Sequence, residues 1–381
     1  MSEKDKDKLK CSNCGALLKF NPDETNLICE YCGSENNIKK EKTKIVENNY
    51  NKFLQNIRDF EINGIYVKCS VCAAEFTLNE NINADICPFC SASIIITNKV
   101  EHKSIKPAYL LPFSISADKA RESFKNWVKT LWFAPNDLKE KSEKQTYLKG
   151  IYLPFWTYDA QTASTYTGKR GDDYYVTEYY TTYENGRAVR RERIIKKTKW
   201  RNVSGKVTNN FDDILICASK SLPRKYVDAL EPWDLRNLVP YKDEYLSGFT
   251  SEFYQIDLEE GFELAKKIID REIYISICED IGGDHQIVTS INTTYYNITF
   301  KHILLPVWVS SYKYRGKIYN FVVNARTGEV QGERPWSLLK ITLFIIFILF
   351  VIFLLILVAN SDVCNYNIRC TLNIIYNFLS N

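Results

Sequence analysis

The pattern of hydrophobic and polar positions is most distinctive near the carboxyl end, where residues 341–359 are apolar except for Thr342. At a rise of 1.5 Å per residue, a helix over 338–359 covers about 30 Å, the thickness of the hydrocarbon core of a bilayer. A helix buried in a soluble domain is seldom apolar on every side. The pattern therefore predicts one transmembrane helix at 338–359.

The charges around this apolar run predict its orientation. Arg334 and Lys340 precede it, whereas Asn360 begins a segment with no cation close to the run. Positive charge favours the cytoplasmic side of a span, and the hydrophilic residues 1–10 carry no secretory signal. We therefore expect the large N-terminal part in the cytoplasm and a short tail, residues 360–381, outside the cell.

An amphipathic helical pattern precedes the strand-rich part of the chain at 41–64, with Asn63-Gly64 as a stop signal. Its apolar positions are Val46, Tyr50, Phe53, Leu54, Ile57 and Phe60. We interpret it as a spacer that packs on its neighbours. A helix that binds a partner is the alternative.

Two more helices are predicted by periodicity and by capping residues. One begins near Ser116 or Asp118 and ends before Pro135. The other begins at Asp257, whose side chain can cap the first turn with Glu260 three residues later, and ends before Gly282-Gly283. Both should bury one face against the body of the protein.

The remaining pattern predicts strands. The last ones are 307–314, 317–324 and a short strand at Glu329-Val330, joined by turns at Arg315-Gly316 and 325–328. Two strand entries are alike, and each follows a predicted helix: Tyr152-Leu153-Pro154-Phe155-Trp156 and Leu304-Leu305-Pro306-Val307-Trp308. We interpret this as an internal duplication of an α+β unit.

Composition supports a strand-rich α+β fold for residues 101–336, which are numerous enough for one large domain or two smaller ones. Phe, Trp and Tyr make up 14% of the chain, and there is a single methionine. Such a core is built from aromatic and β-branched side chains, which suit strands.

Eight of the twelve cysteines form two arrays with identical spacing, C-x2-C-x14-C-x2-C. The arrays are Cys11, Cys14, Cys29 and Cys32, and Cys69, Cys72, Cys87 and Cys90. Two such knuckles complete a closed tetrahedral shell of four thiolates. The spacing predicts two zinc ribbons, at 1–40 and 65–100, each with one structural ion.

Disulfides and a rubredoxin-type iron site are the competing interpretations of these arrays. A closed four-sulfur shell leaves no open position for water or substrate, so we expect neither metal to be catalytic. Each ribbon is too small for a hydrophobic core of its own. Metal binding should therefore supply its folding free energy, and chelation should unfold 11–98 first.

The four other cysteines fall outside the arrays. Cys217 and Cys278 stand in apolar contexts, where cysteine acts as a small hydrophobic residue. Cys364 and Cys370 lie in the tail after the apolar run. A disulfide between these two in an oxidising exterior is a hypothesis.

The highest local charge lies in a predicted hairpin with a turn at Glu184-Asn185-Gly186, whose first strand is rich in tyrosine. Residues 187–206 have a net charge of +8. Its cations are Arg187, Arg190, Arg191, Arg193, Lys196, Lys197, Lys199, Arg201 and Lys206. The strip could bind the phosphates of anionic lipid or nucleic acid, or it could be an ordinary solvated hairpin.

Catalytic motifs are lacking. The sequence has no G-x-x-x-x-G-K-[ST] loop, H-E-x-x-H or G-x-S-x-G. Asp212-Asp213, Asp280, Asp284 and His285 could form an acidic cluster, but acidic residues beside Gly282-Gly283 are typical turn formers. We therefore expect no enzyme activity, with an enzyme of unrecognised type as the remaining alternative.

Four stretches resemble a known family: FDDILICASKSLP at 211–223, LEPWDLRNLVPY at 230–241, EDIGGDHQ at 279–286, and 301–337. They are similar to bacterial single-pass membrane proteins known as TFIIB-type zinc ribbon-containing proteins or, misleadingly, as primosomal helicase PriA-like proteins. The resemblance implies zinc and a bacterial inner-membrane location. Helicase activity is not expected, because the loop that holds nucleotide phosphates is missing.

Together these observations predict a membrane-anchored protein that presents two zinc ribbons and an α+β domain to the cytoplasm. We expect it to act as a binding or scaffolding module for a protein partner. A membrane-tethered nucleic-acid-binding protein that assists replication or transcription is the alternative.

Overall fold

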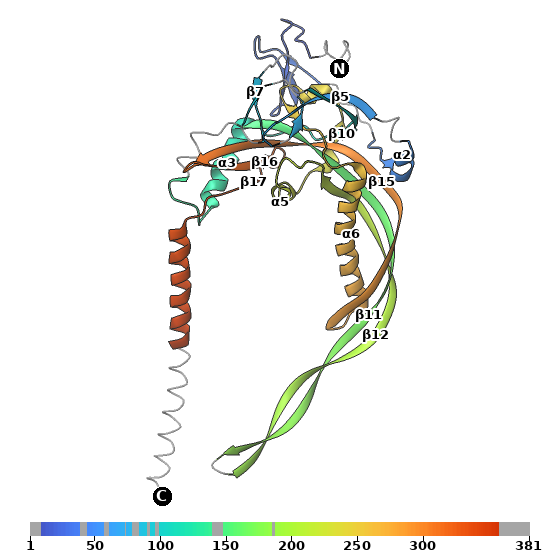
Figure 1. Cartoon of the computed structure of the whole chain (residues 1–381), viewed down its shortest axis with the longest axis vertical. Coiled ribbons are helices and arrows are strands. Elements are labelled where there is room, and N and C mark those ends of the chain that lie inside the picture. The colour runs from blue at the N-terminus through green and yellow to red at the C-terminus, as the bar shows by residue number, and fades with distance from the viewer. Residues whose placement is uncertain are drawn as a thin grey trace.

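The computed structural model describes residues 9–38, 44–56, 61–72, 74–77, 84–89, 92–95, 99–138, 148–184 and 187–357. The chain forms an arch with a central body (Figure 1). The cysteine-containing segments lie on one side of the body, and two long legs leave the other side. One leg is the apolar helix Leu338–Leu357. The other consists of the strands β11 and β12 with helix α6.

A nine-stranded sheet runs through the body and into the second leg. Its main path has the order β12-β11-β15-β10-β13, and β4, β14, β16 and β17 attach beside it. The strands are β4 (Asn48–Asn49), β10 (Tyr109–Leu110), β11 (Lys149–Glu184), β12 (Arg187–Cys217), β13 (Val239–Pro240), β14 (Thr250–Ser251), β15 (His285–Tyr314), β16 (Lys317–Asn324) and β17 (Val330–Gly332). Three of these strands are far longer than the usual five or six residues.

Strands β11 and β15 pair antiparallel through the two similar entry sequences. Leu153 lies opposite Leu305, Pro154 opposite Leu304, and Tyr152 opposite Pro306. The equivalent residues of the two sequences are thus related by an approximate two-fold axis at Leu153. A helix precedes each strand and an antiparallel strand follows each one. The duplication itself stays a prediction from the sequence.

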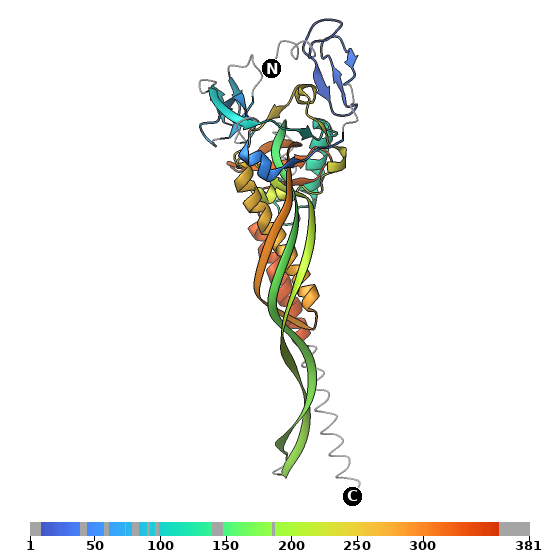
Figure 2. The same cartoon turned by 90° about the vertical axis from the view of Figure 1, so that its right-hand side faces the viewer.

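Helix α6 (Leu258–Ile281) covers the leg of the sheet (Figure 2). Its buried residues include Ile269, Ile273, Ile277 and Ile281, which share one face at steps of four residues. The side chain of Asp257 caps the helix by accepting a hydrogen bond from Glu260 N at 2.7 Å. The start of the helix, its capping residue and its end at Gly282 all agree with the sequence prediction.

The body core is aromatic, as the composition predicted. The rings of Phe113 and Phe249 stack with centroids 3.9 Å apart. Trp156 and Tyr158 are buried in β11, and their polar atoms donate to the carbonyls of Ile256 and Leu258, at 2.9 and 2.8 Å. These two bonds attach the start of α6 to the sheet, because buried Trp and Tyr need polar partners.

Shorter elements complete the body. Helix α3 (Ala117–Thr130) confirms the second predicted helix, with Ser116 as its N-cap residue. The others are α5 (Arg224–Asp228) and the 3-10 turns η2 (Leu235–Asn237) and η3 (Asp243–Leu246).

The structure differs from the predicted helix at 41–64. Helix α2 spans only Tyr50–Gln55, and Asn63-Gly64 lies inside a strand, β5 (Glu61–Lys68). Residues 57–60 lie outside the described part. Strand β5 pairs with β9 (Lys99–Ile105) over its length, and this long-range pairing outweighs the local helical pattern.

The structure thus has a mixed α and β fold with one apolar C-terminal helix. The last turns and strands of the predicted meander are confirmed: β15 ends at Tyr314, β16 is Lys317–Asn324, and β17 follows. Strand β15 begins much earlier than the sequence indicated.

Candidate functional sites: two cysteine clusters and a basic hairpin

The first cysteine cluster brings Cys11, Cys14, Cys29 and Cys32 together. Their sulfur atoms all lie within 4.8 Å of one another, and the Sγ atoms of the Cys11–Cys32 and Cys14–Cys29 pairs are 3.5 Å apart. Sulfurs bound to one zinc ion at 2.3 Å in a tetrahedron would lie about 3.8 Å apart. The cluster therefore has the size of a four-thiolate metal site.

Local structure around this cluster includes two glycine turns and favours the thiolate form of Cys32. The turns after the knuckles use Gly15 and Gly33 with φ of 75° and 72°, values that glycine adopts without strain. The hydroxyl and backbone N–H groups of Ser34 both lower the pKa of Cys32, to about 6. A deprotonated sulfur is the form that binds a metal. Around this site lie β1 (Lys19–Asn21), β2 (Asn26–Ile28) and β3 (Glu35–Asn36).

The second cluster contains Cys69, Cys72 and Cys87, whose sulfurs also lie within 4.8 Å of one another. Cys90, the fourth predicted ligand, is outside the described residues. The chain around this cluster forms β5, β6 (Glu75–Phe76), β7 (Ala84–Ile86), β8 (Ser93–Ile95) and β9. Both clusters could hold metal ions.

Backbone hydrogen bonds join the segments around the two cysteine clusters, which we call the cysteine units, to the body. Phe20 N donates to Ser247 O at 3.0 Å, and Thr77 N donates to Ser251 O at 2.8 Å. Beside the second contact, Glu252 is buried, and its burial raises its pKa to about 8. The side chain of Ser221 donates to this carboxyl group. Both cysteine units are thus bonded to the body, and the buried carboxyl group of Glu252 lies beside the second contact.

The predicted hairpin forms and is much longer than expected. Its register runs without interruption from Ala160 opposite Phe211 to Glu184 opposite Arg187, and the predicted turn residues Asn185 and Gly186 lie outside the described residues. Strand β15 accompanies β11 only as far as Gly171, which lies opposite His285. Beyond that point the described sheet has two strands, and at 3.3 Å per residue this part is about 40 Å long.

The two faces of this two-stranded part, which we call the free hairpin, differ in chemistry. The register puts odd residues of β11 and even residues of β12 on one face, and the remaining residues on the other. The first, aromatic face exposes Tyr175, Tyr179, Tyr183 and Ile194, with Trp200 at its base opposite Gly171. The second, basic face also exposes Tyr174 and Tyr180, and its cations are Arg187, Arg191, Arg193, Lys197 and Lys199, with Arg201 just behind them.

Some of the predicted cations are already paired within the hairpin. Arg193 binds Glu178 at 2.5 Å, and Lys196 binds Asp173 at 2.6 Å. The guanidinium of Arg190 lies over the ring of Tyr179, 4.3 Å from its centroid. Lys197 and Lys199, in contrast, are exposed on the basic face. The free hairpin is thus held by cross-strand pairs, and most of its cations lie on the basic face, whereas Arg190 and Lys196 lie on the aromatic face.

The acidic residues that we considered as a cluster do not come together. Asp284 accepts a hydrogen bond from Asp173 N, and His285 lies 3.1 Å from the carboxylate of Asp173, at the start of β15. Asp213 instead lies at the body end of the same leg, where it binds Lys301 at 2.7 Å.

The lone cysteine Cys217 is buried, as its apolar context predicts, and this burial raises its pKa to about 12.

A second acidic group near Lys301 contains Glu47, Asp159 and Asp212, whose oxygens lie within 4.8 Å of one another. Lys301 Nζ is 2.9 Å from Glu47 Oε1. Burial and the neighbouring Glu47 raise the pKa of Asp159 to about 7. Since Lys301 supplies the positive charge, we interpret this group as an internal ion network. Nothing in the sequence pattern predicted it.

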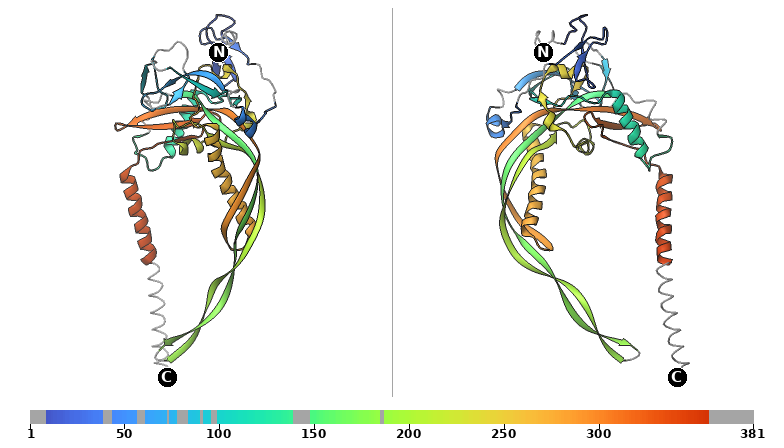
Figure 3. Two further views of the ribbon diagram at one scale, coloured as in Figure 1. Left: turned by 45° about the vertical axis from the view of Figure 1, so that its right-hand side comes forward. Right: turned by 180° about the vertical axis from the view of Figure 1, so that it is seen from behind.

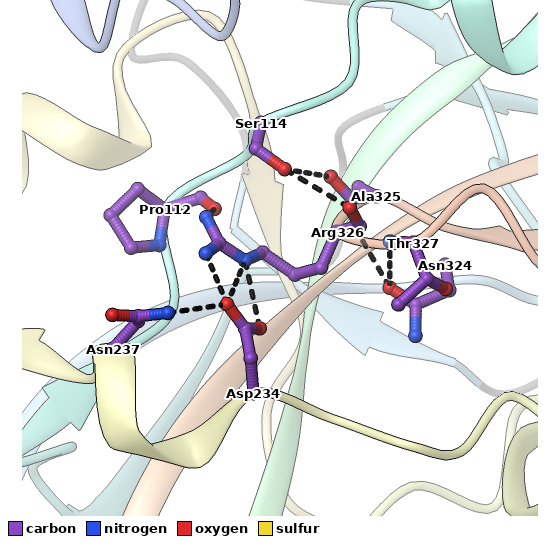
Figure 4. A network of polar contacts seen from close by, with 8 residues as sticks. All are labelled: Pro112, Ser114, Asp234, Asn237, Asn324, Ala325, Arg326 and Thr327. Carbon is purple, nitrogen blue, oxygen red and sulfur yellow. Dashed lines mark hydrogen bonds and ion pairs between the residues drawn. The ribbon is translucent and has the colours of Figure 1, made fainter.

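Two segments that are distant in the sequence meet in the body, at Arg326 and Asp234 (Figure 4). Arg326 Nε lies 2.9 Å from Asp234 Oδ1, and its Nη1 donates to Pro112 O at 3.1 Å. Ser114 Oγ donates to the carbonyls of Ala325 and Arg326. The network links three distant segments, so we assign it a structural role.

The apolar helix Leu338–Leu357 has a mean hydropathy of 3.2. In its most apolar stretch, no residue is buried inside the protein. By length and composition it could cross a membrane. Figures 1 and 3 show that it leaves the body on the same side as the free hairpin, and that the end of the hairpin lies farther from the body than the end of this helix. The cysteine units lie on the opposite side of the body.

Comparison with known proteins gives one relative of similar length. No family model matches the chain. A Bacillus subtilis (strain 168) protein described as "Uncharacterized protein YdjG" is 26% identical over 337 residues, which are 87% of this chain and 91% of that protein. The similarity extends over most of both chains, and the description of the relative states no activity.

Proposed function

We propose that this chain is a membrane-anchored binding and scaffolding protein, and that the free hairpin is its ligand-binding arm. The observation that carries the proposal is the exposure of a long basic and aromatic hairpin that packs against no core in the described structure. An isolated two-stranded hairpin gains little stability in water. A surface of this kind is expected to gain order when a ligand covers it.

In this proposal the helix Leu338–Leu357 anchors the protein in the bacterial inner membrane. Its length suits a bilayer, and Arg334 and Lys340 at its start favour a cytoplasmic body. The position of the cysteine units on the far side of the body would then point them into the cytoplasm. The residues after the helix would then be external.

Each cysteine unit is proposed to hold one structural zinc ion. The four sulfurs of the first unit support a closed shell, and the second unit offers three sulfurs plus Cys90 from the sequence. Because both units bond to the body, zinc would stabilise the surface that they form with it. No reaction is assigned to either ion.

The ligand that the hairpin suits best is a surface rich in phosphate. Its basic face presents Lys197 and Lys199, which suit phosphate oxygens. Charged side chains are costly in hydrocarbon, so the hairpin cannot cross a bilayer beside the helix. With the helix inserted, the hairpin would have to turn away from the direction that it takes beside the helix in Figure 1 and lie along the head groups of the same membrane, where anionic lipids attract cations.

A nucleic acid is the second candidate, because of the aromatic face. Exposed Tyr175, Tyr179 and Trp200 could stack on bases while neighbouring cations contact the backbone. The pairing of Arg190 with the ring of Tyr179 shows that rings and cations alternate closely here. The two candidates share phosphate and differ in whether bases contribute.

The test uses the zinc-loaded full chain in nanodiscs of zwitterionic lipid. Flotation with vesicles measures binding to phosphatidylglycerol, and fluorescence anisotropy measures binding to labelled single-stranded DNA, double-stranded DNA and RNA, at several salt concentrations. Binding to anionic vesicles that weakens with salt supports the lipid ligand, whereas tighter binding to an oligonucleotide supports the second candidate. Absence of both would contradict the proposal.

A further inference from the structure

The loop after α3 is joined directly to the first turn of the apolar helix. Ser337 N donates to Phe133 O at 2.8 Å. Lys340 Nζ donates to Trp132 O at 3.1 Å and to Ala134 O at 2.7 Å. The body therefore contacts the helix at the residues where the helix would enter a membrane.

Aromatic side chains extend this contact along the helix. The ring of Phe133 lies 5.3 Å from that of Phe344, edge to face, and 6.4 Å from that of Trp336. Phe344 is about 9 Å along the helix from Leu338, at a depth that belongs to hydrocarbon in a membrane span. Trp132, whose ring stacks on that of Phe133, is 78% exposed. Exposed tryptophan side chains are typical of the membrane interface.

Beside these rings lies an open groove of about 560 Å³ between the end of α3 and Lys340. Val128, Leu131 and Leu138 form apolar parts of its wall. Lys129 and Lys340 are its charged residues, and none of the described residues that line it is acidic. The groove is thus positive at its polar parts and apolar elsewhere.

Lys340 keeps capacity for a ligand after its contacts with the loop. An ammonium group has three donors, and two of them serve the carbonyls of Trp132 and Ala134. These contacts also offset the partial negative charge at the end of α3, which would otherwise repel an anion. Lys129, in the last turn of α3, is exposed and can approach the same ligand.

We propose that this groove binds the head group of an anionic phospholipid, with Lys129 and Lys340 at the phosphate and Trp132 beside the upper acyl chain. The inference rests on the membrane anchor proposed above. A lipid is favoured over free phosphate because the groove borders the apolar helix and has apolar walls. Bound lipid would fix the body at a set angle to the membrane.

The experiment follows lipid retention by native mass spectrometry of the full chain in neutral detergent, with phosphatidylglycerol, phosphatidylcholine or inorganic phosphate added. We expect one phosphatidylglycerol molecule to be retained in preference to phosphatidylcholine. Lys129→Gln should lower that affinity about fivefold, the effect of one cation near a charged lipid surface. Lys125→Gln, one turn earlier on α3, removes the same charge outside the groove and should change nothing.

The outcomes separate this site from the anchor and from the hairpin. Extraction of the chain from membranes by alkaline carbonate would contradict the anchor and this site together. Retention in the membrane with equal affinity for both lipids, or an equal loss in Lys125→Gln, would overturn the site alone. Displacement of the lipid by inorganic phosphate would show a simple anion site. Glutamate variants of Lys197 and Lys199 in the hairpin should leave the difference between Lys129→Gln and Lys125→Gln unchanged.

Discussion

The guanidinium of Arg326 and the carboxylate of Asp234 form a largely buried ion pair, with Arg326 Nε 2.9 Å from Asp234 Oδ1. The side chain of Arg326 is only 15% exposed. The turn before β17 is thereby bound to the loop before η2, two segments 92 residues apart in the sequence. This pair therefore contributes to the stability of the body.

We expect Arg326→Ala to lower the free energy of unfolding by about 2 to 3 kcal/mol, because it leaves a partly buried carboxylate without its partner. Arg326→Lys should cost less but should not be neutral, since an ammonium cannot donate the paired bonds of a guanidinium. Thermal unfolding followed by tryptophan fluorescence measures both. Arg236→Ala, at an exposed arginine nearby, is the control and should have almost no effect.

The buried carboxyl of Glu252 predicts a pH dependence of stability. Its pKa of about 8 in the folded protein lies above its ordinary value of 4.5, so the folded chain holds a proton that the unfolded chain releases. The stability from this group is therefore complete below about pH 4.5 and is lost as the pH rises through 8.

Glu252→Gln should remove this pH dependence of stability, because the amide side chain stays neutral at every pH. The variant should gain stability relative to the natural protein as the pH rises from 5 to 9, by on the order of a few kcal/mol. Melting temperatures across that range measure the difference. Glu272→Gln, at an exposed glutamate on α6, should track the natural protein; a parallel shift in both variants would refute this account of Glu252.

Metal content tests the cysteine clusters. We expect two zinc ions per chain by elemental analysis, and one after Cys11→Ser. Cys217→Ser, at a buried cysteine in β12 outside both clusters, should retain two. Because structural zinc supplies about 10 to 16 kcal/mol to such units, chelation should expose the clusters to proteolysis before the body unfolds. Iron in place of zinc would contradict the metal assignment.

Thiol labelling tests where the free hairpin lies. We expect Tyr183→Cys, near its end, to react with a membrane-impermeant maleimide only after spheroplasts are lysed, in a chain that lacks Cys364 and Cys370. The reason is that the charged hairpin should stay on the cytoplasmic side with the body. Labelling in intact spheroplasts would show instead that the hairpin reaches the exterior.

The sequence predicted the helices that carry their own boundary signals. Asp257 and the glycines at 282 and 283 define α6, and Ser116 defines the start of α3. It also predicted the hairpin, whose strands pair as far as Glu184 and Arg187. It did not predict the hairpin's length, because residues 160–173 are polar on both faces and lack the alternation that marks a half-buried strand.

Features that depend on distant contacts were also missed. Gly261 reads as a weak point in a helix, yet α6 lies so close to β11 there that an added Cβ would be 2.4 Å from the hydroxyl of Tyr158. Lys301 reads as one more surface lysine, yet it is buried between Glu47 and Asp213. Local patterns contain no information about such partners.

The most direct test of the central claim is a comparison of two charge reversals in the full chain, measured by flotation with phosphatidylglycerol vesicles and by anisotropy with oligonucleotides. One variant changes Lys197 and Lys199 on the basic face to glutamate, and the other changes Lys267 and Arg271 on the exposed side of α6. We predict that the first abolishes salt-dependent binding and that the second leaves it nearly intact. Equal binding by both variants would contradict the proposal and would assign the hairpin cations to protection of an exposed edge strand.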